Sequence, residues 1–379
     1  MTIPFYAPYF DKDDEEAVAE RIRSAWVIGD GDKGKEFEKE FSDYIGVRHT
    51  LLTTSCTTAL DLAIKALNLT SGEAIVPAYT FSSTALAPVL NGLTVKFCDV
   101  NLKDGNIDLD KLEKCITQKT KAIIPVDYAG RPCKIHEIMR IARKNDLYVI
   151  LDAAQSCGSV ISGQKVGQHA DITCFSFHST KNLVSGEGGA LVTNNDEWVA
   201  RACVIREKGT RRNTAEDNNK YGYYGYYEHT TIGNSYVQSD ILAALALSQL
   251  RKLDWMNNKR TKIARRYLEA LKDISRIKLP QDDKIVVSNW HIFGVGVPAD
   301  KLFGIRVELS REGVMCETHY RPLSEHKFFK QFVDAEEGFP QANEFSKSWL
   351  RLPIYVGLSE ENQDVIIRNI RKVFAKHLQ

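Results

Sequence analysis

The segment Cys174-Phe-Ser-Phe-His-Ser-Thr-Lys-Asn-Leu-Val-Ser-Gly-Glu-Gly-Gly-Ala190 decides how the rest of the chain is interpreted. It begins as an apolar, strand-like run, continues through hydroxyl side chains and ends in a glycine cluster. A neutral lysine amine can add to a carbonyl and form a Schiff base, which makes Lys181 a candidate catalyst. The hydroxyls and glycines beside it suit a phosphate-bearing group, because they offer donors and allow close backbone approach. The alternative is an ordinary solvated loop lysine.

A second informative stretch lies upstream, in Tyr148-Val-Ile-Leu-Asp-Ala-Ala-Gln155. Its apolar run predicts a buried strand that ends at Asp152, and ligands of open α/β sheets bind outside the carboxyl ends of the strands. A carboxylate there can hold a protonated ring nitrogen, as in pyridoxal phosphate chemistry. The alternative for Asp152 alone is a helix N-cap. Asp152 and Lys181 together indicate a pyridoxal phosphate site more specifically than either residue does alone.

Apolar strand patterns alternate with helical patterns through the first half of the chain, which predicts a mostly parallel sheet with helices on both faces. The segments that carry this alternation are 95–100, 108–115, 122–126 and 135–142. A long helix is predicted from about residue 239 to residue 271, followed by mixed strands and helices. We therefore expect an α/β protein with a large domain over 1–240, and a linking helix with a smaller α+β domain over 241–379.

The composition narrows the class of protein. The chain has 379 residues, 43% of them hydrophobic, and a formal charge of +1, so it can bury a sizeable core and lacks the basic surplus of a nucleic-acid-binding protein. No apolar run reaches the roughly 18 residues of a membrane span, and the start does not resemble a signal peptide. Eight cysteines occur without a paired C-x-x-C, so we expect reduced thiols, no metal site and a soluble cytoplasmic protein.

Three motifs carry a family resemblance. Asp152-Ala-Ala-Gln155, Ser176-Phe-His-Ser-Thr-Lys181 and Gly186-Glu-Gly-Gly189 together resemble the pyridoxal-phosphate-dependent nucleotide-sugar aminotransferases of fold type I. The resemblance covers nearly the whole chain. Arg206-Glu-Lys-Gly-Thr-Arg211 and Arg351-Leu-Pro353 also resemble segments of members that form dTDP-4-amino-4,6-dideoxygalactose. The resemblance to this family implies that the substrate is a nucleotide-linked 4-keto-6-deoxyhexose and that the amino donor is glutamate. It also implies a role in making surface polysaccharide such as O-antigen.

The resemblance also implies which residues hold the cofactor. Lys181 and Asp152 would be catalytic, and the implied cofactor-binding set is Cys56, Thr57, Phe81, Asp152, Gln155, Ser176, Lys181 and Ser235. Cys56 departs from the family's phosphate-binding Gly-Thr, and its N–H can donate only if the turn there needs no positive φ. From the residues alone, an ordinary Ser/Thr helix cap is the favoured interpretation of Ser55 to Ala59 unless other residues indicate a phosphate. Tyr79 competes with Phe81 for the ring-stacking position, and core filling is the alternative for either residue.

Substrate residues are expected in two further places. Residues 206–231 mix basic and tyrosine side chains, so Lys208, Arg211 and Arg212 are candidates for binding a diphosphate. His319 and Tyr320, at the end of a predicted strand, are candidates for contacting the sugar. The alternatives are a solvated loop and a structural pair, respectively.

The longer segment from Arg206 to Asp240, which is too polar and tyrosine-rich to be core, bears on assembly. In the family, the loop that matches the region of Ser235 crosses a homodimer interface and reaches the partner's cofactor phosphate. Ser235 stands where many members have asparagine, which shortens the reach of the side chain. A homodimer with shared sites is therefore expected, because connectors of this length are commonly functional.

Other activities remain open at this stage. Related sugar dehydratases have histidine in place of the lysine, so Lys181 speaks against that activity. An aminotransferase that acts at another sugar position, and a non-catalytic sugar-nucleotide-binding relative, are the remaining alternatives.

Overall fold

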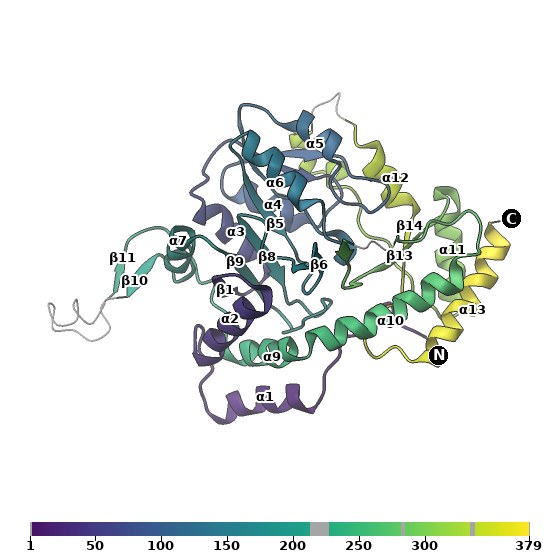
Figure 1. The fold of residues 1–379 in the computed structure, drawn as a ribbon, viewed down its shortest axis with the longest axis horizontal. Coiled ribbons are helices and arrows are strands. Elements are labelled where there is room, and N and C mark those ends of the chain that lie inside the picture. Colours follow the sequence, from purple (N-terminus) through teal and green to yellow (C-terminus); the bar gives the residue numbers. More distant parts are fainter. Residues whose placement is uncertain (1, 213–226, 282–284, 334–337, 379) are drawn as a thin grey trace.

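A seven-stranded mixed sheet forms the centre of the molecule (Figure 1). The computed structural model describes residues 2–212, 227–281, 285–333 and 338–378. In spatial order, the strands are β1 (His49–Thr53), β9 (Gly189–Thr193), β8 (Ile172–Ser176), β5 (Tyr148–Asp152), β4 (Thr120–Ile123), β2 (Glu73–Pro77) and β3 (Thr94–Cys98). Strand β9 runs antiparallel to β1 and β8, and the other pairs are parallel. The predicted α/β class with a mostly parallel sheet is confirmed.

The central strands are apolar on both faces, as expected of strands covered on both sides. In β5, Val149 and Leu151 join the hydrophobic cluster on one face, whereas Ile150 joins the cluster on the other. The first face is covered by α2 (Asp32–Ile45), α5 (Leu109–Cys115), α6 (Ile135–Lys144) and α9 (Asp240–Arg251), and the second by α3 (Cys56–Ala66), α4 (Ser82–Leu90) and α7 (Asp196–Arg206). This burial fixes the carboxyl end of β5 in the interior, where Asp152 lies.

The C-terminal part builds a third hydrophobic cluster, which also takes in Ile3 from the start of the chain. Its elements are α10 (Leu253–Leu271), β13 (Phe293–Gly296), α11 (Ala299–Arg311), β14 (Trp349–Leu352) and α13 (Glu360–His377). Helix α10 runs from α9 towards α11 and α13, where both chain ends lie (Figure 1). The division of the chain at residue 240 stays a prediction.

Shorter elements complete the description. They are α1 (Lys12–Arg23), β6 (Val160–Ile161), β7 (Gln164–Lys165), β10 (Thr210–Arg212), β11 (Tyr227–His229), β12 (Val286–Val287), α12 (Pro340–Ser348) and the 3-10 turns η1 (Tyr128–Gly130), η2 (Leu323–Glu325) and η3 (Phe329–Phe332). Asp11 caps α1 by accepting the N–H of Asp13 at 3.1 Å. Within the described residues, no helix is both long and apolar enough to cross a membrane.

The predicted single helix over 239–271 is wrong in one respect. The chain turns at Lys252, whose φ of −111° ends α9 before α10 begins. The Lys252 amine donates to Asp11 at 2.5 Å and to Asp14 at 2.9 Å, which ties this turn to α1. No glycine or proline marks the end of α9, so the apolar pattern alone predicted one continuous helix.

Candidate active site

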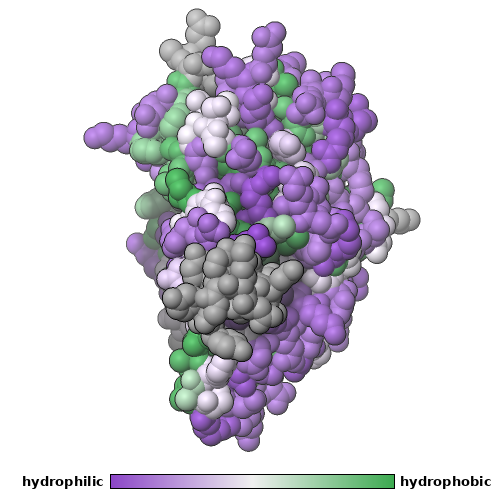
Figure 2. All heavy atoms as spheres, turned by 90° about the vertical axis from the view of Figure 1, so that its left-hand side faces the viewer, coloured by the Kyte–Doolittle hydropathy of each residue, from purple (hydrophilic) through white to green (hydrophobic). Residues whose placement is uncertain are grey.

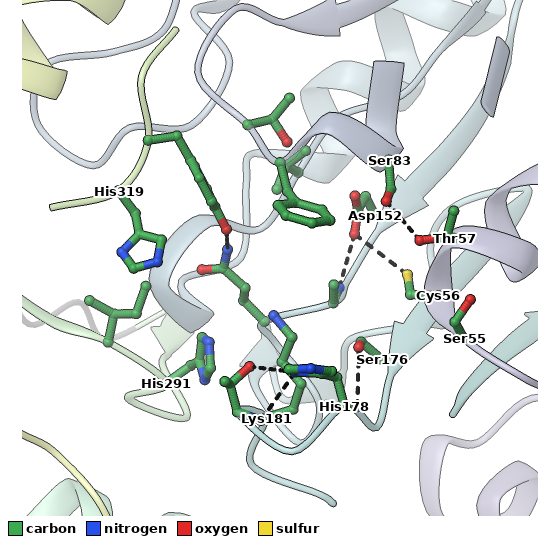
Figure 3. Close-up of a pocket in the computed structure, with 18 of the residues that line it drawn as sticks. Ser55, Cys56, Thr57, Ser83, Asp152, Ser176, His178, Lys181, His291 and His319 are labelled. Atoms are coloured by element: carbon green, nitrogen blue, oxygen red, sulfur yellow. Dashed lines mark hydrogen bonds between the residues drawn. The ribbon is translucent and has the colours of Figure 1, made fainter. Parts of the chain in front are cut away.

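A cavity of about 370 Å³ opens at the carboxyl ends of β5 and β8. It is lined by nine of the residues singled out in the sequence: Cys56, Thr57, Phe81, Asp152, Gln155, Ser176, Lys181, His319 and Tyr320. Figure 3 shows Cys56, Thr57 and Ser83 on one side of this cavity and His291 and His319 on the other, with Lys181 between them. The sheet and the C-terminal part of the chain thus contribute opposite walls.

Asp152 is a buried carboxylate held in a fixed orientation. It is 4% exposed, and it accepts a hydrogen bond from the Thr84 hydroxyl at 2.7 Å and from the Ala154 N–H at 3.1 Å. Burial raises the pKa of Asp152 above its usual range, and the Thr84 hydrogen bond acts in the opposite direction. Turns at residues 154–155 and 157–158 follow Asp152, so this residue caps no helix and the cap alternative is wrong.

Lys181 lines the cavity between the two walls. Burial, aided by the charge of Arg351, lowers the pKa of its amine to about 8, while the charge of Asp152 opposes the shift. The residue follows β8 in a turn where its backbone N–H donates to the His178 carbonyl at 2.8 Å. Lys181 is therefore not a solvated loop lysine, and a substantial fraction of its amine is neutral near pH 8.

The start of α3 supplies hydroxyls and free backbone N–H groups at one end of the cavity. Ser55 caps the helix by accepting the Thr58 N–H at 3.1 Å, so the cap alternative for this segment is correct for Ser55. Thr57 Oγ1 lies 2.7 Å from Ser83 Oγ, at the start of α4. Cys56 has no positive φ, so its N–H meets the condition for donating in place of the family's glycine. Two helix N-termini therefore form an end of the cavity suited to a phosphate.

Within the glycine cluster, Gly189 acts through close packing. A Cβ on Gly189 would lie 2.4 Å from the backbone nitrogen of Cys56, so a side chain there would push β9 away from α3. The close approach of β9 places the start of α3 beside β8. The absence of a side chain at Gly189 thus helps to position the start of α3, which lines the cavity.

The two candidates for the ring-stacking residue, Tyr79 and Phe81, differ in burial. Tyr79 is 1% exposed and packs edge-on against Tyr128 and Phe345, whereas Phe81 is 56% exposed and lines the cavity. Tyr79 is core filling, which leaves Phe81 as the ring that can stack on a cofactor. Gln155 is anchored too: its Oε1 accepts the N–H of Ala129 at 2.7 Å.

The opposite wall comes from the C-terminal part. Gln155 Nε2 donates to the Tyr320 hydroxyl at 2.9 Å, and Arg351 Nη1 lies 2.7 Å from His319 Nδ1. Burial, with the charge of Arg351, lowers the pKa of His319 to about 3, so its ring is neutral and can accept from the guanidinium. The structure thus brings His319 and Tyr320 into the same cavity as Lys181.

Sequence reasoning missed several lining residues. His291 is buried, and its Nδ1 lies 3.1 Å from Oδ1 of Asn182, the residue after Lys181. Burial, then the charge of Lys181, holds the pKa of His291 well below its usual range. Ser83, which also lines the cavity, and Thr84, which donates to Asp152, were not predicted either, and Arg351 was noticed only within a segment that resembles the family. The hydroxyl-rich stretch around residues 80–84 was a usable signal for the first two, whereas His291 stands in no recognisable motif.

Some predicted residues lie elsewhere. Ser235, Lys208 and Arg211 are exposed, and they are absent from the described lining of this cavity. Ser235 pairs with Glu207 in a short antiparallel bridge. Arg212 ends β10, and residues 213–226 of the basic, tyrosine-rich segment lie outside the described residues. A cofactor or diphosphate role for this segment stays a prediction.

A match to a family model decides the family. Residues 8–371 match the model of the DegT/DnrJ/EryC1/StrS aminotransferase family. The chain belongs to this family. Fold type I and pyridoxal phosphate as cofactor follow, and both expectations are confirmed.

The relatives cover nine tenths or more of the chain. The spore coat polysaccharide biosynthesis protein SpsC of Bacillus subtilis is 33% identical over 380 residues, 98% of this chain and 97% of that protein. A UDP-4-amino-4,6-dideoxy-N-acetyl-beta-L-altrosamine transaminase of Campylobacter jejuni is 32% identical over 357 residues, 91% of this chain and 90% of that protein. Among solved structures, a putative sugar aminotransferase of Streptococcus pneumoniae in its PMP-form has a TM-score of 0.93 at 29% identity, and 99% of each chain is covered.

The cavity fits the cofactor of this aminotransferase family. Asp152 is a buried carboxylate without an ion-pair partner among the described residues, and a protonated ring nitrogen would supply the missing cation. The helix starts at Cys56 and Ser82 suit the phosphate end, and Lys181 lies between them and the opposite wall. The donor set thus matches pyridoxal phosphate in charge at both ends.

Proposed function

We propose that this protein transfers an amino group from glutamate to a nucleotide-linked keto sugar. The observation that carries the proposal is the Lys181 amine, whose pKa is lowered to about 8, in one cavity with the buried carboxylate Asp152. An amine that is part neutral can form a covalent bond to a carbonyl and can also move protons. The non-catalytic alternative has no need for this pairing.

The residues around Lys181 would hold the cofactor in a set orientation. Asp152 would pair with the ring nitrogen, Phe81 would stack on the ring, and the N–H groups at Cys56 and Thr57 would bind the phosphate. Gln155 and Ser176 would complete the binding set. When bound, pyridoxal phosphate carries the amino group between the two substrates and withdraws electrons from the carbon that loses its proton.

Lys181 would act as base and as acid in turn. In the first half, its neutral amine would take the proton from the α-carbon of the amino donor and pass it to the bound cofactor. In the second half, the same amine would take a proton back from the cofactor and deliver it to the sugar carbon that becomes aminated. Both transfers use the Nζ atom, so one residue serves both halves of the reaction. The neutral rings of His291 and His319 add no further positive charge beside this amine.

The proposed sugar substrate is dTDP-4-dehydro-6-deoxy-glucose, which would give dTDP-4-amino-4,6-dideoxygalactose for a surface polysaccharide. The motif of His178, Thr180 and Lys181 and the segment Arg351-Leu-Pro353 support a 4-keto sugar by resemblance. The names of two relatives refer to spore coat polysaccharide and to a 4-amino-4,6-dideoxy sugar. The Campylobacter relative is named for a UDP sugar, so a UDP-linked 4-keto sugar is the second candidate.

The substrate proposal is tested by direct competition. Purified protein is supplied with ¹⁵N-glutamate and equal amounts of dTDP- and UDP-linked 4-keto-6-deoxyhexoses, and the products are resolved by mass spectrometry. Label in the dTDP-linked amino sugar is the expected result. Label only in the UDP-linked product would show that the substrate carries UDP and not dTDP. The absence of any labelled sugar would reject the proposed function.

We also propose a homodimer in which each chain contributes to the other's site. Hydrophobic patches lie among hydrophilic side chains on the side of the molecule that carries β10 and β11 (Figure 2). Ile232 is 88% exposed and Tyr227 is 58% exposed, close in sequence to Ser235. Exposed apolar groups of this kind suit burial against a second copy. The phosphate groups in the partner's site would then be contacted by Ser235, Arg211 and Arg212.

Mixed dimers test the shared site. A Lys181→Ala chain is combined with a chain that carries Arg211→Ala, Arg212→Ala and Ser235→Ala, each inactive as a homodimer. Twofold exchange predicts that the mixture regains about one good site per heterodimer. Mixtures that stay inactive, or an active monomer in sedimentation experiments, would reject the shared site.

A further inference from the structure

A second cavity lies apart from the active site. Its volume is about 220 Å³, compared with about 370 Å³ for the active-site cavity. Segments 101–104 and 128–134 of the sheet side form one wall, and segments 280–281 and 286–294 form the other together with Trp349. Among the lining residues that the structure describes, only Ile292 is common to both cavities. Ligand sites are frequent where two parts of a fold meet, so this cavity is a candidate binding site of its own.

The wall from the sheet side is cationic. Lys103, Arg131 and Lys134 all line it, and Asp104 is the single acid among the described lining residues. Arg131 Nε lies 3.9 Å from Asp104 Oδ2. Burial raises the pKa of Asp104, and the charges of the three cations act in the opposite direction, so all three stand near this carboxylate. Three cations and one carboxylate leave a net charge of +2.

The two lysines carry this surplus charge. Lys103 and Lys134 are exposed, and neither amine forms an ion pair with any residue that the structure describes. Asp104 and Arg131 are held in place instead: Asp104 accepts the Asn106 N–H at 3.0 Å, and Arg131 donates to the Gln281 carbonyl at 2.5 Å. A phosphate monoester carries a charge of about −1.5 to −2 near pH 7, which two such amines can balance.

Aromatic side chains line the same cavity. Trp290 and Trp349 are buried lining residues, and Tyr128 joins them from the opposite wall. The Trp349 ring stacks on Phe345 with centroids 4.8 Å apart, and the Trp290 ring stacks on Phe293 with centroids 5.8 Å apart. Rings that are fixed by such packing offer a flat ligand a surface that costs little side-chain entropy to use.

The backbone at Trp290 adopts an unusual conformation. Its φ of 52° lies in the left-handed region, which bulky residues rarely adopt. Two side chains hold the turn: Ser288 Oγ accepts the Trp290 N–H at 3.0 Å, and Asn289 Oδ1 accepts the His291 N–H at 3.0 Å. Strained residues that the surrounding structure fixes in this way are concentrated at functional sites. The turn thus keeps Trp290 in the wall of the second cavity.

We propose that the second cavity binds a phosphate monoester that carries a flat ring. Lys103 and Lys134 would bind the phosphate, and the ring would lie against Trp290. A phosphate dianion matches the net charge of +2, whereas a single carboxylate would leave half of it unbalanced. Nucleoside monophosphates and pyridoxine-type phosphates share this chemistry. The binding is independent of the amino transfer proposed above, because neither Lys181 nor Asp152 lines this cavity.

The test uses holoenzyme whose cofactor has been fixed by borohydride, so that the active site is already occupied. dTMP and pyridoxine 5′-phosphate are titrated separately and followed by calorimetry. We expect one molecule to bind per chain and to change the tryptophan fluorescence, because Trp290 and Trp349 line the cavity. Binding of dTMP alone would identify a nucleotide site, and binding of pyridoxine 5′-phosphate alone a site for phosphates of the cofactor type.

Two further ligands separate the parts of the probe. Thymidine carries the ring without the phosphate, and ribose 5-phosphate carries the phosphate without the flat ring. Each should bind at least about tenfold more weakly than the better of the two probes, because each loses one of the two contacts.

A pair of double variants locates the binding. Lys103→Gln combined with Lys134→Gln should raise the dissociation constant of the probe roughly 10- to 100-fold. Lys119→Gln combined with Lys121→Gln removes the same charge from exposed positions outside the cavity lining, so its affinity should equal that of the wild type. Cofactor content and the thermal midpoint should be unchanged in both, which verifies that the variants are folded.

Three results would overturn the inference. The first is a holoenzyme that binds neither probe at millimolar concentration. The second is unchanged affinity in the folded Lys103 and Lys134 double variant, which would place the ligand elsewhere. The third is thymidine that binds as tightly as dTMP, which would show that the phosphate is not recognised. Probe binding in a protein that transfers no amino group would reject the proposed function and support the second site.

Discussion

On the sheet side of the cavity, Asp152 is held by Thr84 at 2.7 Å, and Thr57 Oγ1 lies 2.7 Å from Ser83 Oγ. On the opposite wall, Arg351 contacts a neutral histidine and has no acid within the described residues. Each wall carries a buried charge without an ion-pair partner among the described residues, yet the Asp152 carboxylate is held by hydrogen bonds from Thr84 and Ala154, whereas the Arg351 guanidinium contacts a neutral ring.

This difference separates two tasks. Hydrogen bonds fixed in advance suit a cofactor that stays bound, because they orient Asp152 before anything arrives. An open cation suits a substrate that comes and goes, since its partner is then the ligand. Lys181 stands between the walls, where it can act on both.

The largest effect is expected at Lys181 itself. Lys181→Arg keeps the positive charge but cannot become neutral, so amino transfer should fall by at least about 10³-fold while the cofactor still binds. Product formation by mass spectrometry and cofactor content by absorbance measure the two properties. The exposed Lys119→Arg serves as control and should match the wild type. Turnover retained in Lys181→Arg would show that Lys181 is not the residue that acts between the two walls.

The bonded wall should show the next largest effect. Asp152→Ala should slow proton removal from the donor by at least ~10²-fold, as is typical of losing an aligned electrostatic group. Thr84→Val keeps the carboxylate and removes its 2.7 Å hydrogen bond, so a smaller loss of about tenfold is expected. Stopped-flow rates of the donor half-reaction measure both. An unaffected rate in Asp152→Ala would make this residue merely structural.

The rate at which the protein takes up its cofactor should depend on pH through the amine of Lys181. Burial lowers its pKa to about 8, so the neutral fraction grows as pH rises through that value. Loading of cofactor onto cofactor-free protein should accelerate roughly fivefold from pH 7 to pH 8 and level off above about pH 9. Absorbance kinetics follow the loading. A steady tenfold rise per pH unit through pH 9 would indicate an ordinary lysine pKa.

The smallest effect is expected at Cys56. Its backbone N–H, not its thiol, is proposed to bind phosphate, and the thiol only lies 3.8 Å from an Asp152 oxygen. Cys56→Ala should therefore raise the dissociation constant of the cofactor less than about fivefold, within the ~1 kcal/mol of one hydrogen bond. Equilibrium dialysis measures it. A much larger loss would assign the thiol a direct role.

Much of the sheet side could be predicted from sequence, because apolar runs mark the strands and polar residues follow them directly. Asp152 and Lys181 sit at such strand ends, and the order of strands and helices placed them at one edge. The start of α3 could be predicted as well, because its hydroxyl residues directly follow the apolar strand β1.

The opposite wall was harder to predict for a physical reason. His291 and Arg351 come from separate segments that meet only when the C-terminal part packs on the sheet, and neither stands in a periodic pattern. Arg351 was noticed through resemblance alone. The choice between Tyr79 and Phe81 also required packing, since both residues follow the same strand and only burial distinguishes them.

Borohydride reduction of the holoenzyme, followed by peptide mapping, tests the central claim most directly. Reduction fixes the cofactor to the lysine that holds it, and the mass of each peptide reports where. The account predicts that the label lies on Lys181 and is absent from the Lys181→Arg variant. Label on another lysine, or no label in a protein that has bound pyridoxal phosphate, would contradict it.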